Sequence, residues 1–266
     1  MYATVKEYFR SKCFCFSERM MLRSVQSLLG FKLLARDGVI GTVYEFYFDD
    51  KTWTVRYLVA DTGTWLQGRR ILIPPIVFGK LDWNNQNFPV SLTKEQIQKS
   101  PSIDEKKPVS REKQIELHRY FGWPAYWQSG DFMHTAPIPP PPDPRIIKKG
   151  QEKKNSHTHL RSTREVRKYR VRSTNGEIGH VEDYILNDES WIILYVVVDT
   201  GNWLPGKQVL VSNSWVNRID WEERVVSVDL TKDVVKKSPE YDPSKPVNRE
   251  YEIRLYDFYG RPKYWQ

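Results

Sequence analysis

Short apolar runs alternate with polar turns through the first two thirds of the segment 22–128. Runs rich in Val, Ile, Tyr and Trp that are bounded by Gly, Asn and Asp are typical of β-strands joined by hairpins. The pattern predicts strands at 31–35, 38–48, 53–60, 70–73, 77–83 and 88–92. Closing such short strands into a small barrel would protect their edges, so we expect a barrel.

The periodicity changes after residue 92. Thr93 and Gln96 have the spacing of a capping box, which predicts a short helix at this point. A second helix is predicted over 110–120, where apolar residues stand among charged ones, and Gly122 is expected to end it. The helix is expected to pack on the barrel, and the ending Tyr126-Trp127-Gln128 is expected to fold back as an apolar clasp.

The whole of this pattern occurs twice. Residues 22–128 align with residues 160–266 without a gap at a constant offset of 138, and about 40 of the 107 aligned pairs are identical. A repeat of this length matches a complete small domain. The sequence predicts an N-terminal extension over 1–21, a first repeat over 22–128, a linker over 129–159 and a second repeat over 160–266. Because gap-free duplications commonly descend from homodimers, we also expect the repeats to form an intrachain pseudo-dimer.

Charge is concentrated in one stretch of the chain. The formal net charge is +8, whereas residues 145–172 contain 11 Lys or Arg and only two Glu, which leaves the rest close to neutral. The linker also contains a proline run at 137–144, which favours extended polyproline geometry. Two interpretations remain open: a solvated tether, or a weak contact with RNA or an anionic membrane. The candidate polyanion contacts are Lys148, Lys149, Lys153 and Lys154.

The sequence predicts neither a metal site nor a cofactor. Cys13 and Cys15 are the only cysteines, and both precede the first repeat. A Cys-x-Cys pair supplies two ligands where zinc takes four, and no glycine motif that cradles phosphate follows a strand. The N-terminus lacks the apolar core of a signal peptide, and no apolar run is long enough for a membrane span. These observations predict a cytoplasmic protein, and a position at the periphery of the inner membrane is the finer expectation.

Three segments carry a resemblance to a known family. These are the entry at Asp37–Gly41, the hairpin with Asp50 and Trp53, and the strand and loop at 59–68, each repeated 138 residues later. The chain resembles the PRC-barrel family, which includes the cytoplasmic domain of the photosynthetic reaction centre H subunit and the C-terminal domain of the bacterial ribosome maturation factor. The closest resemblance is to stand-alone bacterial members of that family.

The resemblance implies a mainly β chain with two tandem small PRC-type β-barrels, each followed by a short C-terminal helix. It also implies a protein without enzymatic activity that serves as a protein-binding or scaffold module. Association with a membrane electron-transfer complex or another multiprotein complex is the finer functional expectation. The resemblance implies a protein partner and does not identify it.

The duplicated Asp-Thr-Gly triplet supports an alternative hypothesis. Aspartic proteases place one such triplet at the end of an apolar strand in each lobe, so that Asp61 and Asp199 would share a proton and activate water. The structural interpretation is that each Asp caps a turn while Gly supplies a permissive backbone. In that interpretation the loops are interface candidates, with Trp65 and Trp203 as partly exposed anchors. The candidate loop residues are Asp61, Thr62, Gly63, Trp65, Leu66, Gly68, Asp199, Thr200, Gly201, Trp203, Leu204 and Gly206.

Overall fold

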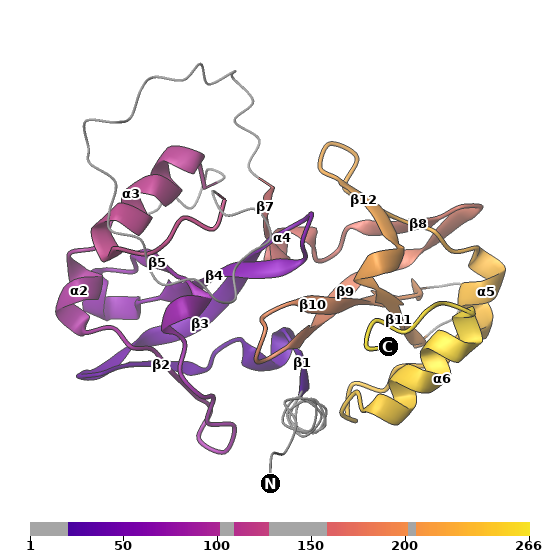
Figure 1. The fold of residues 1–266 in the computed structure, drawn as a ribbon, viewed down its shortest axis with the longest axis horizontal. Helices are drawn as coiled ribbons and strands as arrows, with labels where there is room; N and C mark the ends of the chain where they lie inside the picture. Colours follow the sequence, from indigo (N-terminus) through magenta and orange to yellow (C-terminus); the bar gives the residue numbers. More distant parts are fainter. Residues whose placement is uncertain (1–20, 102–108, 128–158, 202–205) are drawn as a thin grey trace, which may run out of the picture.

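The computed structural model describes residues 21–101, 109–127, 159–201 and 206–266. Two similar halves lie side by side along the long axis of the molecule, the first from indigo to magenta and the second from orange to yellow (Figure 1). Each half contains one sheet and ends in a short helix. The expected fold class, mainly β with a short helix after each repeat, is confirmed.

The two sheets have closely related strand orders. The first runs β5-β4-β3-β2-β6, and the second runs β11-β10-β9-β8-β13-β12. In both sheets the long central strand pairs antiparallel with its neighbours, and a parallel pair joins the early strand to a late one. The strands of the first sheet are β2 (Lys32–Ala35), β3 (Gly38–Asp49), β4 (Thr54–Asp61), β5 (Arg70–Ile73) and β6 (Asn87–Pro89). Those of the second are β8 (Arg170–Ser173), β9 (Gly176–Asn187), β10 (Ile193–Asp199), β11 (Gln208–Ser212), β12 (Val216–Asp220) and β13 (Val225–Val228).

The strand predicted at 77–83 is wrong for the first half. A 3-10 turn, η3 (Pro75–Val77), precedes two isolated bridges there, whereas β12 forms a continuous strand at the equivalent place in the second half. Pro89 stands in the partner strand where the second half has Ser227, which pairs with Arg218. Proline has no N–H to donate to a ladder, so the pairing in the first half is interrupted.

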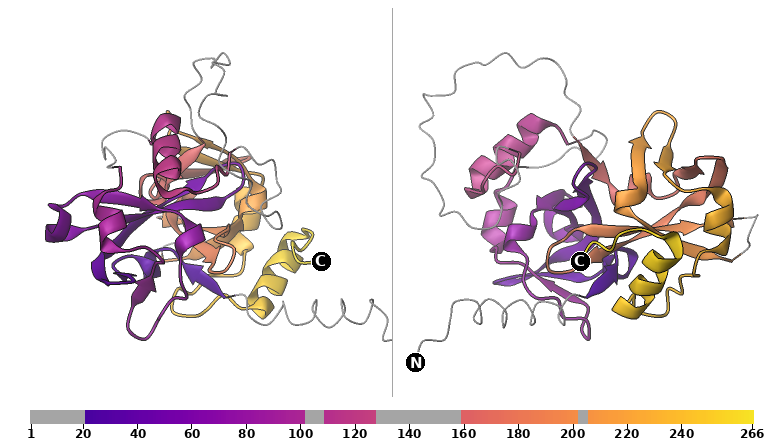
Figure 2. Two further views of the ribbon diagram at one scale, coloured as in Figure 1. Left: turned by 60° about the vertical axis from the view of Figure 1, so that its left-hand side comes forward. Right: turned by 45° about the vertical axis from the view of Figure 1, so that its right-hand side comes forward.

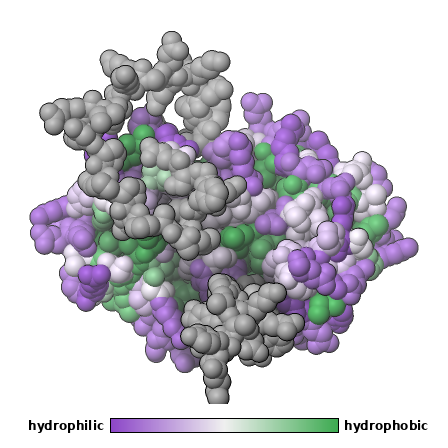
Figure 3. All heavy atoms as spheres, viewed as in Figure 1, coloured by the Kyte–Doolittle hydropathy of each residue, from purple (hydrophilic) through white to green (hydrophobic). Residues whose placement is uncertain are grey.

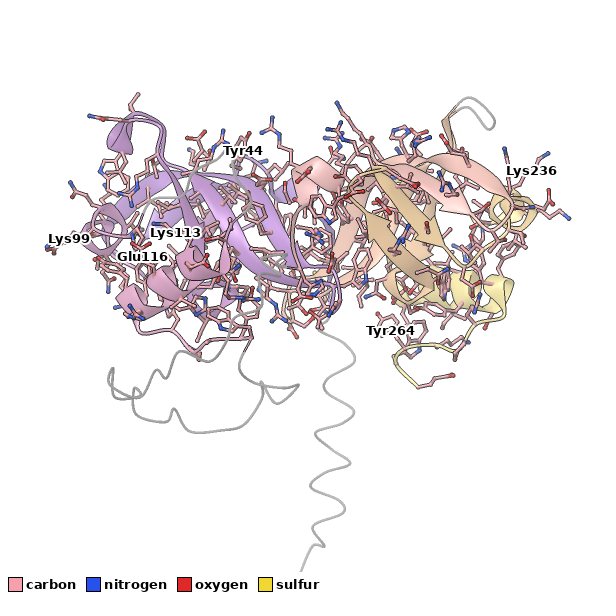
Figure 4. All side chains as sticks on the ribbon, turned by 90° about the horizontal axis from the view of Figure 1, so that it is seen from above. Tyr44, Lys99, Lys113, Glu116, Lys236 and Tyr264 are labelled. Carbon is pink, nitrogen blue, oxygen red and sulfur yellow. The ribbon has the colours of Figure 1, made fainter. Side chains whose placement is uncertain are left out.

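The helices follow the predicted signals. Thr93 and Gln96 form the predicted capping box in front of α2 (Lys94–Gln98), and α3 (Arg111–Phe121) ends at Gly122 in a left-handed conformation. Their counterparts are α5 (Lys232–Lys237) and α6 (Arg249–Tyr259). Figure 4 shows Lys99, beside α2, and Lys236, on α5, at opposite ends of the molecule.

The tyrosine of each clasp bonds to the helix that precedes it. The Tyr126 hydroxyl donates to Gln114 Oε1 at 2.7 Å, and the Tyr264 hydroxyl donates to Glu252 Oε1 at 2.8 Å. The neighbouring tryptophans also contact their helices, with Trp127 4.8 Å from the His118 ring and Trp265 5.2 Å from the Tyr256 ring. The predicted clasp is therefore confirmed in both halves.

Each half supplies the first strand of the other half. The strand β1 (Leu22–Ser24) pairs with β9 of the second half, and β7 (Leu160–Ser162) pairs with β3 of the first half. Figures 1 and 2 show β1 reaching from the indigo half to the orange half. Leu22 opposes Asn187 and Leu160 opposes Asp49, so the two pairings are equivalent under the offset of 138. The repeats therefore exchange strands reciprocally.

The exchange is organised around one point where β4 and β10 begin. Thr54 and Ile192 form an antiparallel bridge, and these two positions correspond to each other in the repeat. The Val55 amide donates to the Trp191 carbonyl, and the Ile193 amide donates to the Trp53 carbonyl, each at 2.8 Å. A pseudo-two-fold axis therefore passes through this bridge.

The hydrophobic core is continuous across this junction. Trp191 of the second half lies among Phe46, Phe78 and Phe88 of the first, with ring centroids 6.0, 4.7 and 5.6 Å away. One cluster of buried side chains extends from Leu22 to Tyr256 and includes both sheets. Trp53 and Trp191 hold matching left-handed conformations, with φ of 55° and 57°. Such strain persists where surrounding contacts enforce it, which fits the dense aromatic packing here.

This packing predicts the effect of removing Trp191. Trp191→Ala should lower the free energy of unfolding by about 3–5 kcal/mol, because a large ring leaves a cavity in the first half. Urea unfolding followed by circular dichroism should show one cooperative transition shifted to lower urea. Trp221→Ala, at a half-buried position, is the matched control and should cost less. Loss of the second half's structure alone, with an unchanged first-half transition, would contradict a shared core.

Candidate functional site

The two Asp-Thr-Gly triplets form equivalent turns at the ends of β4 and β10. Asp61 Oδ1 accepts the Gly63 amide at 2.9 Å, and Asp199 Oδ1 accepts the Gly201 amide at 2.7 Å. The buried threonines, Thr62 and Thr200, donate their hydroxyls across the loop to the carbonyls of Arg69 and Lys207, at 2.6 and 2.8 Å. Both carboxylates are therefore engaged in their own turns, as the structural interpretation of the triplet predicts.

A close backbone approach holds each turn in place. A Cβ atom on Gly41 would lie 2.0 Å from the Asp61 carbonyl oxygen, and one on Gly179 would lie 1.9 Å from that of Asp199. Both glycines also have a positive φ near 140°. Only glycine can satisfy both constraints, which explains why the entry sequence and the Asp-Thr-Gly sequence occur together in each repeat.

The structure does not bring Asp61 and Asp199 together. β4 and β10 begin at the shared bridge of Thr54 and Ile192 and run in opposite directions from it. A strand rises about 3.3 Å per residue, so the two strand ends lie on the order of 40 Å apart. Two carboxylates share a proton only when they are in contact, and the geometry therefore gives no support to the protease hypothesis.

The loop after Asp61 is largely occupied by contacts within the first half. Trp65 and Leu66 belong to η2 (Gly63–Leu66) and pack, half-buried, against the main core. The Gly68 amide bonds to the Gly63 carbonyl at 2.6 Å, and Gly68 and Gly206 have φ of 75° and 78°. The equivalent Trp203 and Leu204, and the candidate polyanion contacts Lys148, Lys149, Lys153 and Lys154, lie outside the described residues. The binding roles of both sets stay predictions.

Two buried carboxylates secure the exchanged strands. The Ser24 hydroxyl donates to Asp183 Oδ2, and at the equivalent place the Ser162 hydroxyl donates to Glu45 Oε2. Burial raises the pKa of Asp183 to about 6 and outweighs the opposing hydrogen bond from Ser24. Burial likewise raises the pKa of Glu45. The sequence alone gave no reason to group these serines and acids, because the paired residues are more than 100 positions apart.

Ion pairs beside these serines repeat the same symmetry. Arg23 Nε lies 3.3 Å from Asp188 Oδ2, and Arg161 Nε lies 2.5 Å from Asp50 Oδ2. Asp50 is one of the residues that carry the family resemblance, and its carboxylate therefore contacts the exchanged strand of the other repeat. Both ion pairs are half-buried, so they help to orient β1 and β7 on the other repeat and stabilise the fold only modestly.

A pocket of about 330 Å³ opens beside the pseudo-two-fold axis, on the side of the first half. Its walls come from the start of β4 with the turn before it, the proline turn at the start of η3, the end of α3 with the segment after it, and the turn that precedes β10. Apolar surface (green) in Figure 3 gathers over the first half and at the junction of the halves. The lining residues are Thr52, Thr54, Val55, Arg56, Pro74, Pro75, Ile76, His118, Trp123, Pro124, Tyr126, Ser190 and Ile192. We call this cavity the junction pocket.

The polar groups of the junction pocket have distinct roles. His118 Nδ1 donates to the Pro124 carbonyl at 2.8 Å, which leaves Nε2 to accept the Tyr57 hydroxyl at 2.7 Å. Burial lowers the pKa of His118, so the neutral ring forms part of the wall. Arg56 lies 4.3 Å from the centre of the Tyr126 ring and donates from Nη2 to Thr52 at 3.1 Å. Its Nε is buried and has no hydrogen-bond partner among the described residues.

The second half has diverged at the equivalent positions. Ile76, Arg56 and Trp123 correspond to Ser214, Leu194 and Arg261. Arg261 donates a hydrogen bond to Asp229 at 2.8 Å. Asn213, which replaces Pro75, donates to the Ile193 carbonyl at 2.8 Å. Both polar side chains are therefore engaged within the second half. Sequence reasoning missed this site, although the loss of repeat identity at these positions was a signal that could have indicated it.

Substitution of the close-approach glycine tests the structural role of the Asp-Thr-Gly turn. Gly41→Ala should destabilise the fold by more than about 3 kcal/mol, because a backbone clash adds to the left-handed strain. Gly30→Ala is the matched control, since Gly30 has φ +83° with nothing within 4 Å of the added Cβ, and it should cost about 1 kcal/mol. Thermal unfolding of both variants measures the difference. Equal losses of stability in the two variants would show that the close approach of Gly41 to the Asp61 carbonyl does not constrain this position.

The raised pKa of Asp183 predicts how stability varies with pH. The Asp183 carboxyl ionises near its ordinary pKa of 3.8 in the unfolded chain and near 6 in the folded chain. Its contribution to the free energy of unfolding is therefore fully present below about pH 4 and is lost by about pH 6. Asp183→Asn keeps an acceptor for the Gln26 amide and places an amide donor at the Ser24 hydroxyl. It removes the titrating group and should therefore remove up to about 3 kcal/mol of this decline. Urea unfolding of both proteins between pH 4 and 7 tests it, and parallel pH profiles would contradict the assignment.

Comparison with known protein families agrees with the architecture. A model of the PRC-barrel domain matches residues 21–91 and, separately, residues 160–235. No curated protein matches the chain. Each match begins at an exchanged strand and runs through the long hairpin, the Asp-Thr-Gly turn and the late strands of its half. Because the matches together cover more than half of the sequence, the chain belongs to the PRC-barrel domain family and carries two copies of that domain.

Proposed function

We propose that this chain is a protein-binding or scaffold module that has no catalytic activity of its own. PRC-barrel domains are generally non-catalytic, and the chain contains two of them. The two aspartates of the protease hypothesis are held in separate turns at distant strand ends, which also favours a binding role. The junction pocket is the feature that carries the proposal.

The exposure of Ile76 supports a binding role for this pocket. Ile76 is 60% exposed, the largest exposed fraction among the large hydrophobic side chains of the described residues. It lies at the pocket, next to two prolines, and its counterpart in the second half is the polar Ser214. Concave apolar sites with a few placed polar groups are the usual form of a binding site, and exposed apolar surface at their rim marks a contact with a partner.

The strand exchange gives the pocket a rigid frame. Ser190 and Ile192 come from the second half, whereas the remaining walls come from the first. Their relative position is fixed by the bridge of Thr54 and Ile192 and by the inserted Trp191. A partner would therefore meet a preorganised surface, which reduces the ordering cost of binding.

Location and assembly remain proposals. Within residues 21–101, 109–127, 159–201 and 206–266, no helix is long and apolar enough to cross a membrane. We propose a cytoplasmic protein at the periphery of the inner membrane, with a multiprotein complex such as an electron-transfer assembly as the partner. The resemblance to the reaction centre H subunit motivates this assignment.

Site-specific photo-crosslinking tests the proposed function. A photoreactive phenylalanine analogue at position 76 should give discrete crosslinked partners in cells that contain the full chain. The same analogue at position 214 is the matched control, because Ser214 is exposed at the equivalent place of the second half. At least fivefold more adduct at position 76 is the expected result. Equal yields at the two positions would contradict a partner-binding role for the junction pocket.

A further inference from the structure

We propose that the junction pocket binds an extended, proline-containing segment of a partner protein and that an acidic side chain of this segment contacts Arg56. This inference rests on the proposed function and adds the chemistry of the partner. It is carried by the walls of the pocket, by the pairing of the strands around it and by the state of Arg56.

Aromatic and proline rings form the walls, and other contacts hold them rigid. Trp123 is stacked on Phe121, with ring centroids 4.0 Å apart and planes at 11°. Tyr126 is fixed by its hydrogen bond to Gln114 and by the guanidinium of Arg56. Pro74 and Pro75 also line the pocket. Aromatic-lined grooves with fixed rings suit polyproline II segments, whose own conformation is also preformed.

Addition of a β-strand, another common mode of peptide recognition, fits this pocket poorly. Addition of a strand needs a free sheet edge, but at the pocket wall β4 already pairs with β3 on one side. On the other side, the Thr54–Ile192 bridge and the Val55 amide join it to the segment before β10. A polyproline segment needs no ladder of backbone hydrogen bonds, because its backbone stays solvated.

Arg56 indicates the charge of the ligand. Its side chain is mostly buried, and Asp49 Oδ2 lies 3.8 Å from Nη2, near the limit for an ion pair. Nε has no partner among the described residues, and an unpaired buried donor is costly. Arg56 lines the pocket, so a carboxylate bound there would compensate the charge of its guanidinium. An acidic residue next to the prolines therefore matches the pocket better than a basic one.

The second half serves as an internal comparison. There Leu194 replaces Arg56, Ser212 and Asn213 replace the two prolines, and Ser214 replaces Ile76. A 3-10 turn stands at the equivalent place, η5 (Asn213–Trp215), but the residues that would recognise a proline segment and its acid are missing. The chemistry thus belongs to the first half and does not follow from the barrel fold itself.

Fluorescence anisotropy with a defined peptide tests the proposal. The probe is a fluorescein-labelled ten-residue peptide of Pro-Pro-Ala repeats with one central Asp, titrated with the full chain. We expect saturable binding that falls at least tenfold for Ile76→Ser and for Arg56→Leu, both of which copy the second half. Replacing the peptide Asp by Asn should weaken binding to the wild type and should have no further effect on Arg56→Leu. Ser214→Ala is the control and should bind like the wild type.

Each outcome bears on the proposal. Absent binding, or equal binding of a peptide with Ala in place of Pro, would overturn the proline chemistry. If position 76 still crosslinks partners in that case, the proposed binding function stands and only this inference fails. A variant with Pro137, Pro139 to Pro142 and Pro144 changed to Ser should bind the probe like the wild type. At least tenfold tighter binding by that variant would show that segment 137–144 of this chain competes for the pocket. It would overturn a partner protein as the occupant.

Discussion

The rest of the structure depends on the reciprocal exchange of first strands between the two repeats. β1 completes the sheet of the second half and β7 completes that of the first, around a bridge between Thr54 and Ile192. The hydrogen bonds of Val55 and Ile193 cross this bridge in both directions. Because Trp191 then fills the core of the first half, the two barrels share one interior. Neither the core nor the junction pocket is complete in one repeat alone.

Duplication followed by divergence explains why symmetry and asymmetry coexist. The backbone devices are shared by both halves: the glycine approach to the Asp-Thr-Gly turn, the serine–carboxylate contacts, and the tyrosine clasp. The pocket is not shared, because the second half has Leu, Ser and Arg at the positions of Arg56, Ile76 and Trp123. Constraints of folding thus keep the two copies alike, whereas the surface positions at the junction are free to differ. This separation is the physical basis for assigning a binding role to the first half.

The sequence predicted those features that depend on local chemistry. The capping box at Thr93, the end of α3 at Gly122 and the turn at Asp61 all involve residues a few positions apart, and all are confirmed. The strand at 77–83 failed because Pro89, in the strand that would pair with it, has no N–H to donate, and only two isolated bridges form there. Trp53 and Trp191 belong to the hairpins that carry the family resemblance, but the pattern could not show that Trp191 fills the core of the other repeat.

The sequence carries little local signal for the strand exchange or for the junction pocket. A three-residue strand such as β1 carries almost no periodic signal, and its partner lies more than 160 residues away. The pocket collects residues from four segments, none of which is distinctive by itself. Both features arise from tertiary pairing, which a single sequence does not specify locally.

Amide hydrogen exchange at Val55 and Ile193 is the most direct test of the central claim, because their N–H groups donate across the two halves. If the swapped strands β1 and β7 join the repeats into one cooperative body, the hydrogens of these amides should exchange with solvent only through global unfolding. Their opening free energy should then equal that of Val59 and Val197 in the middle of the two sheets. Exchange of Val55 and Ile193 that is faster by a hundredfold or more, with protection retained at Val59 and Val197, would contradict the account.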